Sequence, residues 1–154
     1  MKNKNTEQLA EMRHFYDSVY YASDKPDLSV SNHLQRLAHK IGIHEGQQVL
    51  DVACGVGNWL HTCKKLGAST SGVDLSEKAI AACKSVMPEG DFHAGPAESL
   101  PFEDERFDVV TCLGSLEHFV DPGNALKEML RVAKDNATFL LLVPNADFLT
   151  RRLG

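Results

Sequence analysis

Apolar residues recur every three to four positions in five segments of the chain, and short continuous apolar runs lie between these segments. The first spacing is typical of amphipathic helices and the second of buried strands. Residues that commonly cap helices, Thr6, Ser31, Ser76 and Asp121, precede four of the helical patterns. We therefore expect helices in residues 6–19, 31–42, 60–67, 76–87 and 121–133, and strands in 48–53, 69–75, 91–94, 107–114 and 138–144.

The alternation of strands with helices predicts an α/β fold. Short strands joined through helices pair in parallel with right-handed crossovers, so we expect a doubly wound, mostly parallel sheet of about five strands. In such sheets ligands bind beyond the carboxyl ends of the strands, near the point where the strand order reverses. The loops that follow the strands are therefore where candidate chemistry is expected.

Composition and charge narrow the class of protein. The chain has 154 residues, 43% of them hydrophobic and 24% charged, as in an ordinary globular domain. A net charge of −5 without a basic cluster argues against a nucleic-acid-binding protein. The longest apolar run, ATFLLLV, is too short to span a bilayer, and no apolar stretch follows the basic start MKNKNTEQ. Four cysteines without a CxxC pair favour reduced thiols and a cytoplasmic protein.

The stretch VLDVACGVGNWL, residues 49–60, places two glycines directly after an apolar run. Gly55 and Gly57 would lie in the turn between the first strand of the sheet and the next helix. Bare backbone there lets a ligand approach closely, and amide N–H groups at the helix start can meet its polar atoms. A tight turn in which the glycines serve packing alone is the alternative.

An acidic residue follows the second expected strand. Asp74 lies 17 residues after Gly57, in GVDLS, where a carboxylate can accept two hydrogen bonds from ribose hydroxyls. The alternative is an aspartate that merely flanks a helix. A glycine turn and an acid together indicate a ligand that contains adenosine. Both a dinucleotide and another nucleoside fit these two features.

Further features of the sequence distinguish a dinucleotide from another nucleoside. The third glycine of a dinucleotide-binding turn is absent, since Leu60 occupies its position. Four segments, VLDVACGVGNW, GVDLS, AESLPFEDERFDVV and SLEHFVDPGNALKEMLRVAK, together resemble the class I S-adenosylmethionine-dependent methyltransferases. The resemblance covers about residues 45–145 and is greatest to the small-molecule group that includes ubiquinone and menaquinone biosynthesis enzymes. It implies a Rossmann-like core, S-adenosylmethionine as cofactor, S-adenosylhomocysteine as product, and methyl transfer to an O, N or C atom of a small molecule.

The resemblance also implies roles for individual residues. Asp74 matches the acid that binds the ribose, and Leu75 and the backbone N–H of Ala97 match groups beside the adenine. The methionine portion of the cofactor is matched by Asp51, Ala53, Gly55 and Gly57, and the surroundings of the sulfonium by Leu113, Gly114 and Ser115.

The sequence departs from the family pattern at several positions. Pro96 stands where the family usually has an aspartate that meets the adenine amino group, so we expect Glu98 or a backbone carbonyl to compensate, or adenine recognition to be weaker. Ala53 replaces the commoner first glycine. The usual LKPGG before the fifth strand is AKDNA, residues 133–137, which we expect to alter only a turn.

Three further interpretations concern residues near the expected cleft. His118, in SLEHF, is the candidate general base, with ordering of the loop as the alternative. Relatives that bind a metal carry an acid at the position of Gly114, so no bound metal is expected. Tyr16, Tyr20 and Tyr21 belong to the segment that closes over the cofactor in relatives, and their alternative role is helix packing.

These matches divide the chain into a helical lid, residues 1–44, and a cofactor-binding core, residues 45–154. The last strands of the family do not follow the fifth strand, so we expect a fragment that binds cofactor but turns over poorly. An open fifth-strand edge would favour a homodimer. Two rival functions are a cofactor-binding module without turnover and, disfavoured by the missing third glycine, a nucleotide-dependent oxidoreductase.

Overall fold

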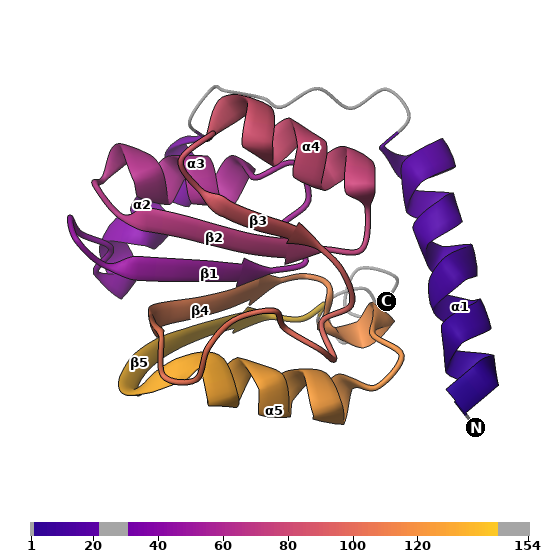
Figure 1. The fold of residues 1–154 in the computed structure, drawn as a ribbon. Coiled ribbons are helices and arrows are strands. Elements are labelled where there is room, and N and C mark those ends of the chain that lie inside the picture. Colours follow the sequence, from indigo (N-terminus) through magenta and orange to yellow (C-terminus); the bar gives the residue numbers. More distant parts are fainter. Residues whose placement is uncertain (1, 22–30, 145–154) are drawn as a thin grey trace, which may run out of the picture.

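A parallel five-stranded sheet forms the centre of the computed structural model, which describes residues 2–21 and 31–144. The strand order is β3-β2-β1-β4-β5, and all four neighbouring pairs run parallel (Figure 1). The reversal of strand order falls between β1 and β4. The strands are β1 (Gln48–Val52), β2 (Ser69–Asp74), β3 (Asp91–Ala94), β4 (Phe107–Leu113) and β5 (Ala133–Leu142).

Helices cover both faces of this sheet (Figure 1). α2, α3 and α4 pack on one face and α5 on the other, while α1 lies beyond the carboxyl ends of the strands. The helices are α1 (Lys2–Phe15), α2 (Asn32–Ile41), α3 (Asn58–Lys65), α4 (Glu77–Val86) and α5 (Pro122–Val132), with a π-helical turn η1 (Tyr16–Tyr20) and a 3-10 turn η2 (Leu116–His118). The expected doubly wound α/β fold is confirmed.

Each face of the sheet has its own hydrophobic cluster. Successive residues of a strand point to opposite faces. Val49 of β1 is therefore buried against α2, α3 and α4, whereas its neighbour Leu50 is buried in the cluster that holds Met129 of α5. Strands buried on both faces account for the continuous apolar runs in the sequence.

The helix caps follow the sequence prediction closely. The Ser76 hydroxyl accepts a 3.1 Å hydrogen bond from the N–H of Ala79, and Asp121 Oδ1 accepts one of 2.9 Å from the N–H of Asn124. Ser31 caps α2 in the same way, and α2 ends at Gly42. These local signals determine where the helices begin, because each cap satisfies an N–H group that has no partner within its helix.

Two local predictions are wrong. The first helix begins at Lys2 instead of after a Thr6 cap, and it passes directly into η1, where the Tyr21 N–H donates to the Tyr16 carbonyl at 2.8 Å. The AKDNA segment is not a turn, because β5 starts at Ala133. The pairing of β5 with β4 changes register at this point. Phe107 pairs with Ala133, whereas Val109, two residues later, pairs with Thr138. Residues 22–30, which come after the first helix and η1, lie outside the described residues.

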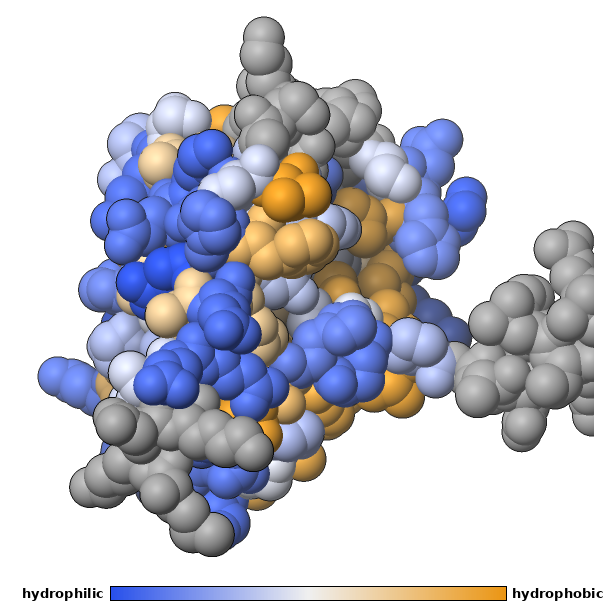
Figure 2. Space-filling model, turned by 90° about the vertical axis from the view of Figure 1, so that its right-hand side faces the viewer, coloured by the Kyte–Doolittle hydropathy of each residue, from blue (hydrophilic) through white to orange (hydrophobic). Residues whose placement is uncertain are grey.

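Several large apolar side chains remain at the surface of the described chain. β5, at one edge of the sheet, exposes Phe139, Leu141 and Leu142 by 37–45%, and the N-terminal segment exposes Val19 and Tyr20 by 63% and 58%. Figure 2 shows hydrophobic residues gathered in the middle of the side on which α1 lies, bordered by hydrophilic ones. Among residues 2–21 and 31–144, no helix combines the length and apolar character needed to cross a membrane.

Candidate functional site

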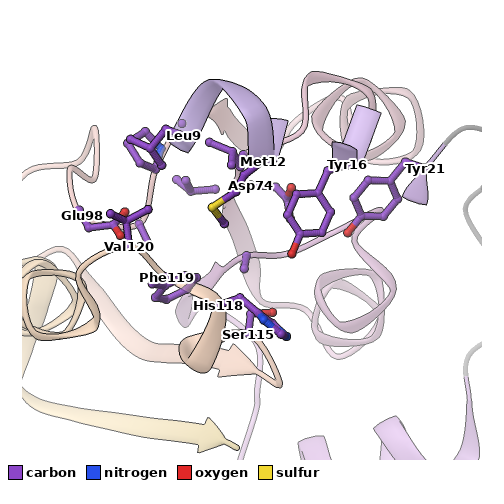
Figure 3. A pocket seen from close by; sticks show the side chains of 16 residues that line it. Leu9, Met12, Tyr16, Tyr21, Asp74, Glu98, Ser115, His118, Phe119 and Val120 are labelled. Carbon is purple, nitrogen blue, oxygen red and sulfur yellow. The ribbon is translucent and has the colours of Figure 1, made fainter. Parts of the chain in front are cut away.

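A cavity of about 80 Å³ lies beyond the carboxyl ends of β1 and β2, between the sheet and the N-terminal segment (Figure 3). This is the position at which parallel α/β sheets bind ligands. Most of the predicted cofactor residues meet here. Its walls are Leu9, Met12, Tyr16, Tyr21, Ala53, Val73, Asp74, Leu75, Gly95, Pro96, Ala97, Glu98, Ser115, His118, Phe119 and Val120.

The turn after β1 reaches the cavity through Ala53, and its Gly55 faces the cavity-lining Tyr21. Ala53 has a positive φ of 64°, and its N–H donates to the Val73 carbonyl at 2.7 Å, so the turn is bonded to β2. Gly55 has φ of 54°, and a β-carbon added there would stand 3.0 Å from the Tyr21 hydroxyl. A side chain at position 55 would therefore displace a wall of the cavity.

Gly57 has a different environment from Gly55. It precedes the first residue of α3 with φ of 85°, and an added β-carbon would lie 2.9 Å from both Cys83 Sγ and Met87 Cε. These contacts lie between α3 and the α4 region, away from the cavity. Packing of the two helices therefore requires a glycine at position 57 whether or not a ligand binds.

Asp74 is held rigidly at the end of β2. Its Oδ2 accepts a 2.8 Å hydrogen bond from the Gly55 N–H, and its Oδ1 accepts one of 2.9 Å from the Ser76 N–H. Burial raises the pKa of this carboxyl, and the backbone N–H groups act in the opposite direction. Each oxygen retains a lone pair, so the carboxylate can still accept bonds from a ligand.

Asp51 lies beneath the turn and does not line the cavity. It is 3% exposed, and its Oδ1 accepts a 2.6 Å hydrogen bond from the Thr111 hydroxyl, which in turn accepts from Trp59 Nε1 at 3.1 Å. Burial raises the pKa of Asp51 to about 7, against the lowering effect of Thr111, and the nearby charge of Asp74 raises it further. Two neighbouring carboxylates of this kind favour a positively charged ligand.

The loop after β3 forms another wall, with Pro96, Ala97 and Glu98 all at the cavity. The carboxylate of Glu98 is turned toward α5, where its Oε1 accepts a 3.0 Å hydrogen bond from the Asp121 N–H. The Glu98 carbonyl accepts a 2.8 Å bond from the side chain of Asn124. Glu98 is therefore engaged in joining this loop to α5 and does not simply replace a carboxylate at position 96.

The loop after β4 contributes Ser115 and His118 to the cavity, while Leu113 and Gly114 stand outside its wall. His118 has a largely exposed side chain, and its Nε2 lies 3.7 Å from Glu117 Oε1. Among the described residues, no group of three or more His, Cys, Asp or Glu side chains is arranged to hold a metal ion.

The N-terminal segment forms the wall opposite the sheet (Figure 3). Tyr16 and Tyr21 line the cavity, whereas Tyr20 stacks edge-on against both rings at centroid distances of 5.7 and 4.8 Å and is exposed. Burial raises the pKa of Tyr21 and of Tyr16, and the charge of Asp74 adds to both shifts. Of the three tyrosines, Tyr21 is the one nearest to the glycine turn.

Sequence reasoning did not identify part of the cavity wall. Leu9 and Met12 share the helical spacing of Tyr16, and this spacing by itself predicts only the apolar side of a helix. Phe119 and Val120 directly follow His118 and carry no signal beyond their apolar character. The remaining unpredicted wall residues are Val73 and Gly95.

Comparison with known proteins agrees with this geometry. The family model described as "Methyltransferase domain" matches residues 50–141. A demethylmenaquinone methyltransferase of Chlorobaculum parvum is 30% identical over 149 residues, which cover 90% of this chain and 62% of that protein. The crystal structure of YcgJ from Bacillus subtilis aligns with a TM-score of 0.68 at 28% identity, covering 80% of this chain and 56% of that one.

A second solved structure, PH0226 from Pyrococcus horikoshii OT3, aligns with a TM-score of 0.73 at 29% identity, over 87% of this chain and 69% of that one. The chain spans between 38% and 62% of the length of the first relatives that it matches.

Proposed function

This chain belongs to the methyltransferase domain family, and from that premise we propose that it transfers a methyl group from S-adenosylmethionine to a small molecule. S-adenosylmethionine is the cofactor of the class I family. The proposal is carried by one hydrogen bond between the glycine turn and Asp74. The Gly55 N–H donates to the Asp74 carboxylate, the group expected to bind the ribose, at 2.8 Å. The match to a demethylmenaquinone methyltransferase supports an organic small molecule as acceptor.

The residues around the cavity fit the parts of this cofactor. Asp74 would hold the ribose hydroxyls, while Leu75, Pro96 and Ala97 offer an apolar surface for the adenine. The methionine portion would lie along Ala53 and Gly55, above Asp51. Burial makes the ionised forms of Asp51 and Asp74 less stable. The positively charged ammonium and sulfonium groups of the cofactor would offset this cost. Leu113, the last residue of β4, and Gly114 directly after it would border the sulfonium.

The N-terminal segment would act as a lid over this cofactor. Cofactor pockets usually enclose about 300 Å³ or more, so a cavity of about 80 Å³ is too small for the nucleoside while the N-terminal side chains stand as they do. We propose that Tyr16 and Tyr21, which belong to this segment, move outward when the cofactor binds. We assign residues 1–44 to this lid and residues 45–154 to the core, and Tyr20 to the lid surface.

The cofactor supplies a methyl group on a sulfonium, which is already a good leaving group. The protein contributes mainly orientation, because an acceptor must approach within about 3–3.5 Å of the methyl carbon and in line with the departing sulfur. His118 stands at the cavity wall and would accept the proton of an acceptor hydroxyl or amine. Leu9, Met12, Phe119 and Val120 favour an acceptor with a large apolar part, with O, N or C as the methylated atom.

We propose a small-molecule substrate, a cytoplasmic location and a homodimer for this protein. The net charge of −5 supports small molecules over nucleic acid as substrates. The cysteines Cys54, Cys63, Cys83 and Cys112 are all free and buried, which supports a reducing cytoplasmic compartment. The exposed apolar residues of β5 support a homodimer through that edge.

A cofactor-binding module without turnover is the second candidate, favoured by Pro96 at the cavity wall where a carboxylate is usual. Thermal melting with S-adenosylhomocysteine and with NADH tests the cofactor, since a ligand that binds only the native state raises the melting temperature. We expect a rise with S-adenosylhomocysteine alone. A panel of phenols, amines and carboxylates then tests transfer: product from wild type, and less from His118→Gln at equal cofactor affinity, supports the enzyme, and binding without product supports the module.

A further inference from the structure

One acidic side chain joins the N-terminal segment to α4. Asp17, in η1, has an Oδ1 that accepts a 2.5 Å hydrogen bond from the Ser76 hydroxyl and a longer one of 3.3 Å from the Lys78 N–H. Asp17 thus adds a negative charge at the N-terminus of α4, where the helix dipole favours it. Arg13 and Glu77 approach to 3.4 Å beside it, but both are exposed and contribute little.

Ser76 is hydrogen-bonded to both Asp17 and Asp74. Its side chain is fully buried, its hydroxyl accepts the N–H of Ala79 while donating to Asp17, and its own N–H donates to Asp74 Oδ1. A hydroxyl has only one hydrogen to donate, so Asp17 uses the single donor that the cap leaves free. The N-terminal segment is therefore bonded to the residue that also orients Asp74.

Asp17 and the tyrosines belong to one π-helical turn. η1 begins at Tyr16 and is closed by the Tyr21 N–H, so Asp17 lies in the chain between the two tyrosines that line the cavity. Figure 3 shows Tyr16 and Tyr21 side by side at one side of the cavity, with Asp74 next to Tyr16. Isolated π-helical turns are rare and often occur at functional sites.

We propose that Asp17 is a positioning residue, whose bonds to Ser76 and Lys78 hold Tyr16 and Tyr21 over Gly55 and Asp74 and thereby control entry and exit of the cofactor. The inference rests on the proposed function as far as the cofactor is concerned. Asp17 itself lines no part of the cavity and acts through the two tyrosines. Breaking its contact should loosen the lid without altering the cofactor contacts of the core.

The first test needs no ligand. Trypsin cleavage after Arg13 requires local opening of α1, so its rate reports how firmly the segment is docked. We expect Asp17→Ala to be cleaved there about tenfold faster than wild type, as loss of a charged hydrogen bond implies. Asp17→Asn keeps an acceptor oxygen and should fall nearer to wild type. Glu11→Ala, at an exposed acidic residue of α1, is the matched control and should leave the rate unchanged.

The second test measures release of S-adenosylhomocysteine by stopped flow. We expect Asp17→Ala to raise the dissociation rate about tenfold in the wild-type background and less than twofold in a Tyr16→Ala/Tyr21→Ala background, because the effect acts through these rings. An equal effect in both backgrounds, or unchanged cleavage at Arg13, would overturn the positioning role. If wild type does not bind S-adenosylhomocysteine, both the proposed function and the control of cofactor exchange are wrong. The cleavage rates would still show whether Asp17 holds the N-terminal segment against α4.

Discussion

The backbone N–H of Gly55 donates a 2.8 Å hydrogen bond to Oδ2 of Asp74, a residue 19 positions later in the chain. This bond joins the turn after β1 to the end of β2. The two features that the sequence singles out separately, a glycine turn and an acid after a strand, are thus one structural unit. Its geometry is fixed before any ligand arrives, because the Ser76 N–H holds the second oxygen of Asp74.

Substitution of Gly57 by alanine should destabilise the fold through packing. Gly46 is a matched control, because its φ of 84° equals that of Gly57 within a degree, but an added β-carbon there meets nothing within 4 Å. We expect Gly46→Ala to lower the free energy of unfolding by about 1–2 kcal/mol through backbone strain alone. Gly57→Ala should cost about 1–3 kcal/mol more, since Cys83 and Met87 must move. Urea denaturation measures both values, and equal losses would show that the α3–α4 contact tolerates the methyl group.

The stability of the protein should depend on the ionisation of Asp51. Its ordinary pKa is 3.8 and burial raises it to about 7 in the folded protein. Between these values the unfolded chain is ionised and the folded protein is not, so unfolding releases a proton and becomes easier as pH rises. We expect wild type to lose up to about 4 kcal/mol of unfolding free energy between pH 4 and 7, with no further loss above.

Asp51→Asn has no proton to release at this position and should show a clearly smaller slope, to which the raised pKa of Asp74 still contributes. The measurement is the free energy of unfolding of both proteins in urea at several pH values between 4 and 8. Parallel curves would mean that Asp51 is ionised throughout and that its burial is compensated in the folded state.

A carboxylate at position 96 should strengthen cofactor binding. Pro96 lines the cavity, and the Glu98 carboxylate is turned toward the Asp121 N–H, so no acid of this loop faces the expected adenine position. Pro96→Asp should tighten S-adenosylhomocysteine binding about tenfold or less, because one hydrogen bond contributes roughly 0.5–1.5 kcal/mol. Calorimetric titration measures this affinity. Unchanged or weaker binding would indicate that another group already meets the adenine.

Most of the fold could be predicted from the sequence, because its signals are local. Ser31, Ser76 and Asp121 cap the helices that they were expected to cap, and the apolar runs became the five strands. The start of β5 was missed. Residues 134–136 near its start are polar and resemble a turn, but they lie at the register shift between the pairs Phe107–Ala133 and Val109–Thr138, so the strand continues through them.

The candidate site was less predictable, because it depends on tertiary contacts. Position along the chain did not separate Gly55, which faces Tyr21, from Gly57, which packs against Cys83. The bond of Asp17 to Ser76 spans 59 positions, so no local pattern in the sequence indicates it. Nothing in the sequence indicates that the Trp59 indole N–H donates to the Thr111 hydroxyl, which in turn donates to Asp51.

The central claim, that Asp74 and the glycine turn bind the cofactor, is tested most directly by calorimetric titration of S-adenosylhomocysteine into wild type, Asp74→Ala and Asp135→Ala. Asp135 is an exposed acid in β5 and serves as the control for loss of one negative charge. We expect wild type and Asp135→Ala to bind one equivalent with equal affinity. Asp74→Ala should bind roughly 10- to 150-fold more weakly, since hydrogen bonds to a charged group contribute about 1.5–3 kcal/mol. Equal affinity in all three proteins, or no binding by wild type, would contradict this account of the site.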